Sequence, residues 1–90
     1  MKVAIVTPCY NSKDFVLDVL GRIGKEVDFI IAVDDCCPQQ TGQHIIDNSE
    51  DQRVYVQFNE TNQGVGGACI TGFRKAIDLG ADIVVKLDSD

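Results

Sequence analysis

Four short apolar runs alternate along this chain with segments that have the periodicity of amphipathic helices. The runs, rich in β-branched residues, cover residues 3–6, 27–33, 54–58 and 83–87. Between them, apolar residues recur every three or four positions, as on one face of a helix. Strands that alternate with helices in this way build parallel sheets. We therefore predict an α/β fold with an open, mainly parallel sheet, helices on both faces, and the order β-α-β-α-β-α-β.

Polar residues and glycines mark the ends of the predicted helices. Asn11 or Ser12 offers a side-chain oxygen to cap the first helix, and Gly24 ends it. Its inner stripe is predicted to consist of Phe15, Val16, Val19, Leu20 and Ile23. Thr41 is predicted to cap a short second helix, and Gly80 to end the third. The third helix is predicted to face the sheet with Val65, Cys69, Phe73, Ala76 and Ile77.

Size, charge and hydropathy limit the classes of function. Ninety residues with 44% hydrophobic and 24% charged content suit one globular domain. The net charge of −6 argues against nucleic-acid binding, which calls for a basic face. No apolar run approaches the roughly 20 residues that span a bilayer, and the apolar start is too short for a signal peptide. We expect a cytoplasmic protein, or one at the inner face of the membrane in full-length form.

The residues suited to binding chemistry follow the predicted strands directly. Pro8 and Tyr10 follow the first strand, the pair Asp34-Asp35 follows the second, and Asp88 follows the fourth. Ligands of such sheets bind beyond the carboxyl ends of the strands. Asp88 and Asp90 are spaced i, i+2, so in extended chain they point to one side and suit Mg²⁺ or Mn²⁺ with a phosphate.

Each of these residues also has a purely structural interpretation. Pro8 and Tyr10 shape a turn, or the Tyr10 ring packs against a nucleoside base. Asp34 and Asp35 form an ordinary loop pair, or a carboxylate accepts a hydrogen bond from a base or a ribose. A dinucleotide-binding fold is excluded because no glycine-rich turn follows the first strand, and a P-loop is excluded because no Gly-Lys-Ser/Thr occurs.

Taken together, four motifs resemble the family 2 glycosyltransferases over all 90 residues. They are residues 3–11 ending in Pro-Cys-Tyr-Asn, Val33-Asp34-Asp35, residues 62–68 from Asn62 to Ala68, and Asp88-Ser89-Asp90. Residues 70–74 and 85–88 look most like the branch of dolichol- and polyprenol-phosphate sugar transferases. The resemblance implies a nucleotide-sugar-binding, Rossmann-like half of a GT-A fold at residues 1–90, with strand order 3-2-1-4.

The resemblance also implies site roles and partners. Pro8, Tyr10 and Asp35 would line the nucleoside pocket with Asp34 nearby, and Asp88 and Asp90 would hold Mg²⁺ or Mn²⁺ on the diphosphate of a nucleotide-diphosphate sugar. The family transfers the sugar with inversion to an acceptor, here a polyprenyl phosphate or a saccharide. The catalytic base of the family lies beyond Asp90, so we expect no catalytic residue within the 90, weak nucleotide binding and no sugar transfer.

Other interpretations stay open. Cys36-Cys37-Pro38 replaces the commoner Gly-Ser-x of the family, which puts the details of the pocket in doubt. The four cysteines lack metal-site spacing and are expected to be free thiols, although a redox or metal-sensing domain using Cys36-Cys37 is an alternative. A non-catalytic nucleotide-binding α/β module is another. The exposed sheet edge at the fourth strand offers a surface for a homo-oligomer.

Overall fold

The apolar runs form one parallel sheet in the computed structural model, which describes residues 1–88. The strand order is β3-β2-β1-β4, and each neighbouring pair is parallel, as predicted. Strand β3 is an edge strand, also as predicted. The elements in chain order are β1 (Val3–Cys9), α1 (Lys13–Gly21), β2 (Phe29–Asp34), α2 (Thr41–Asn48), β3 (Val54–Phe58), α3 (Gly64–Asp78) and β4 (Ile83–Lys86).

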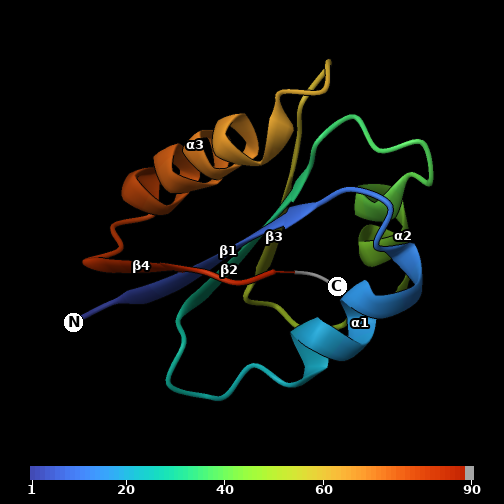
Figure 1. The fold of residues 1–90 in the computed structure, drawn as a ribbon. Helices are drawn as coiled ribbons and strands as arrows, with labels where there is room; N and C mark the ends of the chain where they lie inside the picture. Colours follow the sequence, from blue (N-terminus) through green and yellow to red (C-terminus); the bar gives the residue numbers. More distant parts are fainter. Residues whose placement is uncertain (89–90) are drawn as a thin grey trace.

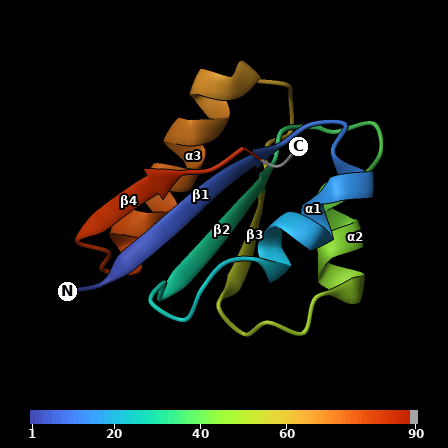
Figure 2. The same ribbon diagram turned by 60° about the horizontal axis from the view of Figure 1, so that its bottom comes forward.

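Helices cover both faces of the sheet, which confirms the predicted fold class. Helices α1 and α2 lie on one face and α3 lies on the other (Figures 1 and 2). Successive strand residues point to opposite faces, so the central strands β1 and β2 supply both cores. The core beneath α1 and α2 contains Cys9, Val16, Leu20, Val27, Ile30, Ala32 and Ile45. The core beneath α3 contains Ala4, Val6, Ile31, Val33, Ala68 and Ala76.

Helix α3 packs on the sheet through small side chains. Its buried residues are Ala68, Cys69, Gly72 and Ala76. A Cβ atom at Gly72 would overlap Cγ1 of Val6 and lie 3.2 Å from Cγ2 of Val33. The predicted inner stripe was therefore partly wrong, because the close approach favours small residues. Three of its large members are exposed by 36–68%, namely Val65, Phe73 and Ile77.

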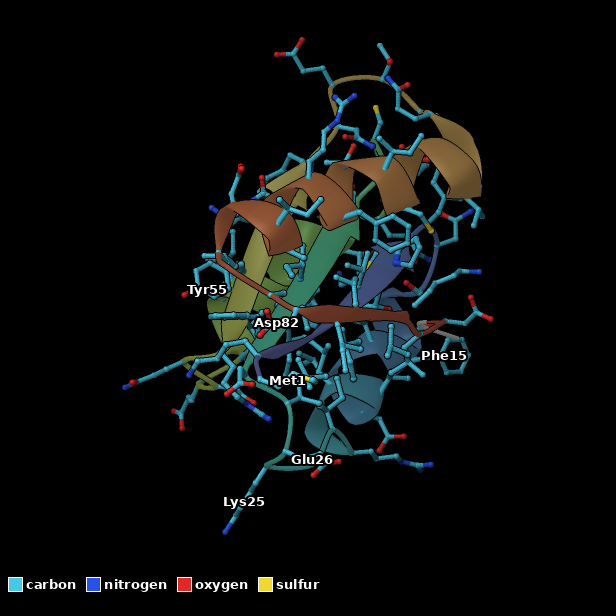
Figure 3. All side chains as sticks on the ribbon, turned by 90° about the vertical axis from the view of Figure 1, so that its left-hand side faces the viewer. Met1, Phe15, Lys25, Glu26, Tyr55 and Asp82 are labelled. Atoms are coloured by element: carbon cyan, nitrogen blue, oxygen red, sulfur yellow. The ribbon has the colours of Figure 1, made fainter. Side chains whose placement is uncertain are left out.

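The shorter helices also differ in detail from the prediction. In α1 only Val16 and Leu20 are buried, while Phe15 is 55% exposed (Figure 3), and the helix already ends at Gly21. A nine-residue helix buries only a narrow stripe of residues spaced i, i+4, here Val16 and Leu20, and Phe15 lies outside this stripe. Thr41 is the first residue of α2 rather than its cap, because Gln40 holds the N-cap position.

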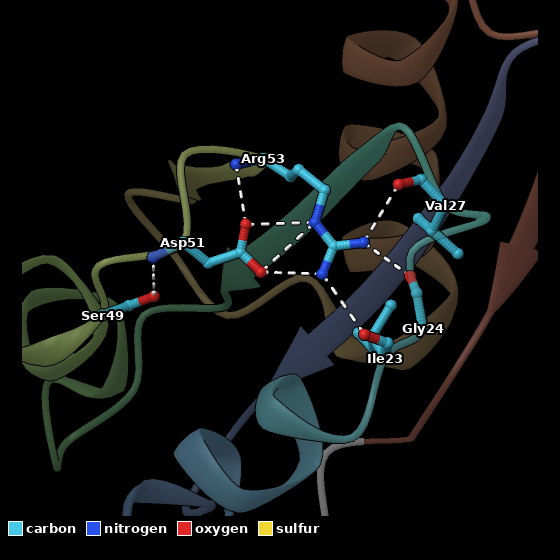
Figure 4. A network of polar contacts seen from close by, with 6 residues as sticks. All are labelled: Ile23, Gly24, Val27, Ser49, Asp51 and Arg53. Atoms are coloured by element: carbon cyan, nitrogen blue, oxygen red, sulfur yellow. Dashed lines mark hydrogen bonds and ion pairs between the residues drawn. The ribbon is translucent and has the colours of Figure 1, made fainter.

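Arg53 organises the end of the sheet where the strands begin. Its guanidinium donates hydrogen bonds to the carbonyl oxygens of Gly24 at 2.6 Å, Val27 at 3.0 Å and Ile23 at 3.2 Å (Figure 4). The same group pairs with Asp51 at 2.8 Å. The hydrogen bonds between Arg53 and Asp51 lower the pKa of the Asp51 carboxyl and raise the pKa of the Arg53 guanidinium. One side chain thus ties the α1–β2 loop to the start of β3.

Within residues 1–88, no helix has both the length and the apolar composition that crossing a membrane requires.

Candidate functional site

A cavity of about 250 Å³ opens at the end of the sheet where the strands finish. Its walls come from the ends of three strands and from the beginning of α3. The residues that line it are Pro8, Cys9, Tyr10, Asp35, Asn62, Gly64, Val65, Ala68 and Asp88. Small-molecule sites of open α/β sheets lie at this edge, between loops that follow neighbouring strands. Of the predicted site residues described here, Pro8, Tyr10, Asp35 and Asp88 therefore meet at one cavity.

Pro8 lies where the ladder between β1 and β4 stops. The last paired residues of the two strands are Val6 and Lys86, and the amide of Leu87 still donates to the carbonyl oxygen of Val6. Proline has no N–H to continue such a ladder, so β4 is free to part from β1 at this point. Tyr10 lines the cavity beside this point; the residue is 47% exposed and offers an aromatic surface to a ligand.

Asp35 is held in place by the turn between β3 and α3. Its Oδ1 accepts hydrogen bonds from Nδ2 of Asn59 at 2.9 Å and from the amide of Gln63 at 2.8 Å. Its own amide donates to the carbonyl oxygen of Cys9 at 3.2 Å. The residue is only 3% exposed, yet it lines the cavity. A carboxylate fixed in this way presents an oriented hydrogen-bond acceptor to a ligand.

Asp34 faces away from the cavity, toward α2. Its Oδ1 accepts from the amide of Cys37 and its Oδ2 from the amide of Gly42, both at 2.7 Å. Neighbouring residues at a strand end point to opposite faces, and the Asp34 carboxylate accordingly points toward α2 whereas Asp35 lines the cavity. Asp34 is absent from the cavity lining, and its carboxylate organises the loop that enters α2.

Asp88 is the accessible carboxylate of the site. Its side chain is 72% exposed, and Oδ1 lies 3.1 Å from Nζ of Lys86. The hard oxygen donors of this side chain suit Mg²⁺ or Mn²⁺. Asp90, its predicted partner in metal binding, lies outside the described residues. Among residues 1–88, no three His, Cys, Asp or Glu side chains are grouped so as to enclose a metal ion.

The turn between β3 and α3 contributes more than the sequence indicated. Gly64 has φ of 76° and donates its amide to Oδ1 of Asn62 at 2.9 Å. Asn59 joins this turn to α3, because its Oδ1 accepts a hydrogen bond from Thr71 at 2.9 Å. Sequence reasoning singled out residues 62–68 as a motif but missed Asn59, whose polar side chain just after a strand was the available signal.

Comparison with known proteins identifies the family. The family model described as Glycosyl transferase family 2 matches residues 4–90. The chain belongs to this family. The undecaprenyl-phosphate mannosyltransferase of Micrococcus luteus is 36% identical over 93 residues, which cover 100% of this chain and 38% of that protein. The UDP-N-acetylglucosamine–dolichyl-phosphate N-acetylglucosaminyltransferase of Methanococcus voltae is 34% identical over 101 residues, covering 96% of this chain and 40% of the relative.

Solved structures of TarS agree with the fold. The crystal structure of Staphylococcus aureus TarS 1–349 in complex with UDP aligns with a TM-score of 0.80 and 28% identity, over 100% of this chain and 28% of the TarS 1–349 chain. The complex of the same protein with UDP-GlcNAc aligns with a TM-score of 0.82 and 27% identity, over 100% of this chain and 27% of that one. The chain thus spans well under half the length of the family members it matches.

Proposed function

We propose that this chain is the nucleotide-sugar-binding part of a glycosyltransferase. The whole protein would transfer a sugar from a nucleotide-diphosphate sugar to an acceptor, with inversion and with help from a divalent metal. One observation carries the proposal: Tyr10, Asp35 and Asp88, which follow three different strands, line one cavity. The UDP and UDP-GlcNAc complexes of TarS, a protein of the same fold, support a nucleotide sugar as the ligand.

The proposed roles follow from the position of each side chain. The Tyr10 ring and Pro8 would pack against the nucleoside, and the Asp35 carboxylate would accept a hydrogen bond from its base or ribose. Asp34 would act indirectly, since both its oxygens already accept backbone hydrogen bonds. In this arrangement the buried carboxylate and the exposed ring select the nucleoside, while Asp88 faces the diphosphate.

A divalent ion would be held by Asp88 together with Asp90 and the donor diphosphate. The carboxylate and phosphate oxygens suit Mg²⁺ or Mn²⁺, ions that bind one or two carboxylates plus substrate phosphates. When bound, the ion would supply Lewis-acid stabilisation to the departing nucleoside diphosphate. The net charge of −6 supports such an ion, because a phosphate ligand needs a cation, backbone N–H groups or Lys/Arg side chains to offset repulsion by the carboxylates.

The acceptor chemistry would belong to other parts of the whole protein. Lipid-phosphate acceptors appear in the names of the Micrococcus and Methanococcus relatives, which supports a polyprenyl phosphate as the acceptor and action beside a membrane. Inversion onto a hydroxyl requires a general base, and a phosphate acceptor requires less help of this kind. We expect the 90 residues to bind the donor nucleotide without transferring its sugar.

Replacing Asp35 by asparagine is expected to weaken nucleotide binding about tenfold or more, because a charged hydrogen-bond acceptor is lost. Calorimetric titration of the 90-residue chain with UDP and GDP, each with Mn²⁺, measures the effect. Asp78→Asn is the matched control, since Asp78 is exposed on α3 and does not line the cavity. Equal affinities for Asp35→Asn and the unchanged chain would refute the role of Asp35.

Removing the divalent metal is also expected to weaken nucleotide binding. Chelation with EDTA should weaken UDP or GDP binding about tenfold or more, because the diphosphate then faces Asp88 without a cation. In Asp88→Asn the difference between titrations with and without Mn²⁺ should shrink. Nucleotide affinity that is indifferent to Mn²⁺ in the unchanged chain would contradict the metal role of Asp88 and Asp90.

A further inference from the structure

The adjacent cysteines of the β2–α2 loop occupy opposite environments. Cys36 is exposed, with a left-handed φ of 56°, whereas Cys37 is buried with 7% exposure. Both are free thiols. The proposed function assigns no role to either residue. Their different surroundings make Cys36 a natural control for any role of Cys37.

The Cys37 thiol connects two loops that are distant in sequence. Its Sγ accepts a hydrogen bond from the amide of Asn11 at 3.2 Å and lies 3.2 Å from Oγ1 of Thr41. The Cys37 amide in turn donates to Asp34. Burial raises the pKa of the Cys37 thiol, but hydrogen bonds from Thr41, Asn11 and Gln39 outweigh it and lower the pKa overall. The Cys37 sulfur therefore accepts a hydrogen bond that joins the β1–α1 loop to the β2–α2 loop.

These two loops form two walls of the cavity. Tyr10 directly precedes Asn11 in the first loop, and Asp35 lies two residues before Cys37 in the second (Figure 2 shows the loops side by side). Asn11 and Cys36 both have positive φ, a conformation that costs free energy and persists only where neighbouring contacts enforce it. The bond from Asn11 to Cys37 is such a contact, because it fixes the residue that follows Tyr10.

We propose that Cys37 is a positioning residue, which sets the spacing between the loops that carry Tyr10 and Asp35. The proposal rests on the proposed function, since its consequence is the affinity for a nucleoside diphosphate. It also makes a purely structural statement, namely that the thiol holds the amide of Asn11. Hydrogen exchange at Asn11 tests the contact, and nucleotide affinity tests its consequence, so the failure of one is distinguishable from the failure of the other.

The structural statement is tested by amide hydrogen exchange at Asn11. Cys37→Ala removes the acceptor and should speed exchange at Asn11 about tenfold, the equivalent of one hydrogen bond. Cys37→Ser restores an acceptor and should recover most of the protection. Cys36→Ala should leave exchange at Asn11 unchanged. Protection at Asn11 that is the same in Cys37→Ala as in the unchanged chain would overturn the proposal, whether or not any nucleotide binds.

The functional statement is tested by calorimetric titration with UDP or GDP, whichever the unchanged chain binds more tightly, in the presence of Mn²⁺. Cys37→Ala should bind about tenfold more weakly, Cys37→Ser within about threefold, and Cys36→Ala like the unchanged chain. Full affinity in a Cys37→Ala variant that has lost protection at Asn11 would overturn the coupling. If the unchanged chain binds neither nucleotide, the proposed function fails, while exchange at Asn11 still decides the role of the thiol.

A measurement on the unchanged chain avoids any folding defect of the variants. Separation of the β1–α1 and β2–α2 loops would open the cavity and at the same time expose the amide of Asn11. Saturating nucleotide should therefore slow exchange at Asn11 about tenfold, because it stabilises the closed arrangement. Exchange at Asn11 that ignores a bound nucleotide would overturn the coupling.

Discussion

Replacing Gly72 by valine is expected to lower the free energy of unfolding by about 3 kcal/mol, at the upper end of overpacking effects. Any Cβ at this position overlaps Cγ1 of Val6, a side chain of β1 that is completely buried beneath α3. Relief of the overlap requires Val6 or α3 to shift. Urea denaturation followed by circular dichroism measures the loss. Because α3 also carries Gly64, Val65 and Ala68 of the cavity wall, nucleotide affinity should fall as well.

Gly66→Val is the matched control for this substitution. Gly66 lies in the same helix, but a Cβ there meets nothing within 4 Å. We expect a change in unfolding free energy within about 0.5 kcal/mol, as for other surface substitutions. Equal destabilisation by the two substitutions would contradict the role of the contact with Val6, since valine has a higher helix propensity than glycine and propensity alone predicts no loss.

Replacing Arg53 by methionine is expected to cost about 2–3 kcal/mol of unfolding free energy, because the carbonyl oxygens of Ile23, Gly24 and Val27 lose a charged donor. Methionine retains much of the aliphatic stem, so the difference reports mainly on the guanidinium. Arg22→Met is the matched control. Arg22 forms an exposed i, i+4 pair with Asp18, and such pairs contribute less than about 0.5 kcal/mol. Similar losses in both variants would contradict the role of Arg53.

The same substitution should change how stability depends on pH. Hydrogen bonds from Arg53 hold the pKa of the Asp51 carboxyl below its usual range, with a smaller opposing contribution from burial. A carboxyl with a lowered folded pKa stabilises the protein fully above its unfolded pKa of about 3.9, and this stability disappears as pH falls through the folded pKa. The stability gap between the unchanged chain and Arg53→Met should therefore be constant near neutral pH and shrink below about pH 4.

The elements of the fold could be predicted from the sequence because each has its own periodicity. The apolar runs of β1 and β2 are continuous, as expected of strands buried on both faces, and that pattern alone indicates a parallel sheet between helices. The strand order came from the resemblance to a family rather than from the pattern. Helix faces were less predictable, since the contact with the sheet at Gly72 selects small residues over Phe73 and Ile77.

The candidate site, like the fold, could be predicted only in part from the sequence. Sequence reasoning placed Tyr10, Asp35 and Asp88 at one edge of the sheet, since residues that follow parallel strands collect there. It placed Asp34 only near the pocket, and the alternation of side chains at a strand end is consistent with the turn of that carboxylate toward α2. It did not predict a positioning role for Cys37, because Asn11, the partner that gives the thiol its place, lies 26 residues away in sequence.

The order of residue types along the chain determined the alternation of strands and helices, because hydrophobic periodicity is a property of the local sequence. It also determined the edge at which polar groups gather, because these groups directly follow strands that run in the same direction. Only the tertiary structure decided which carboxylate reaches the cavity, which face of α3 is buried and which loops are joined. Those outcomes depend on distances between segments far apart in sequence, and steric fit and hydrogen-bond geometry between such segments arise only once the chain has packed.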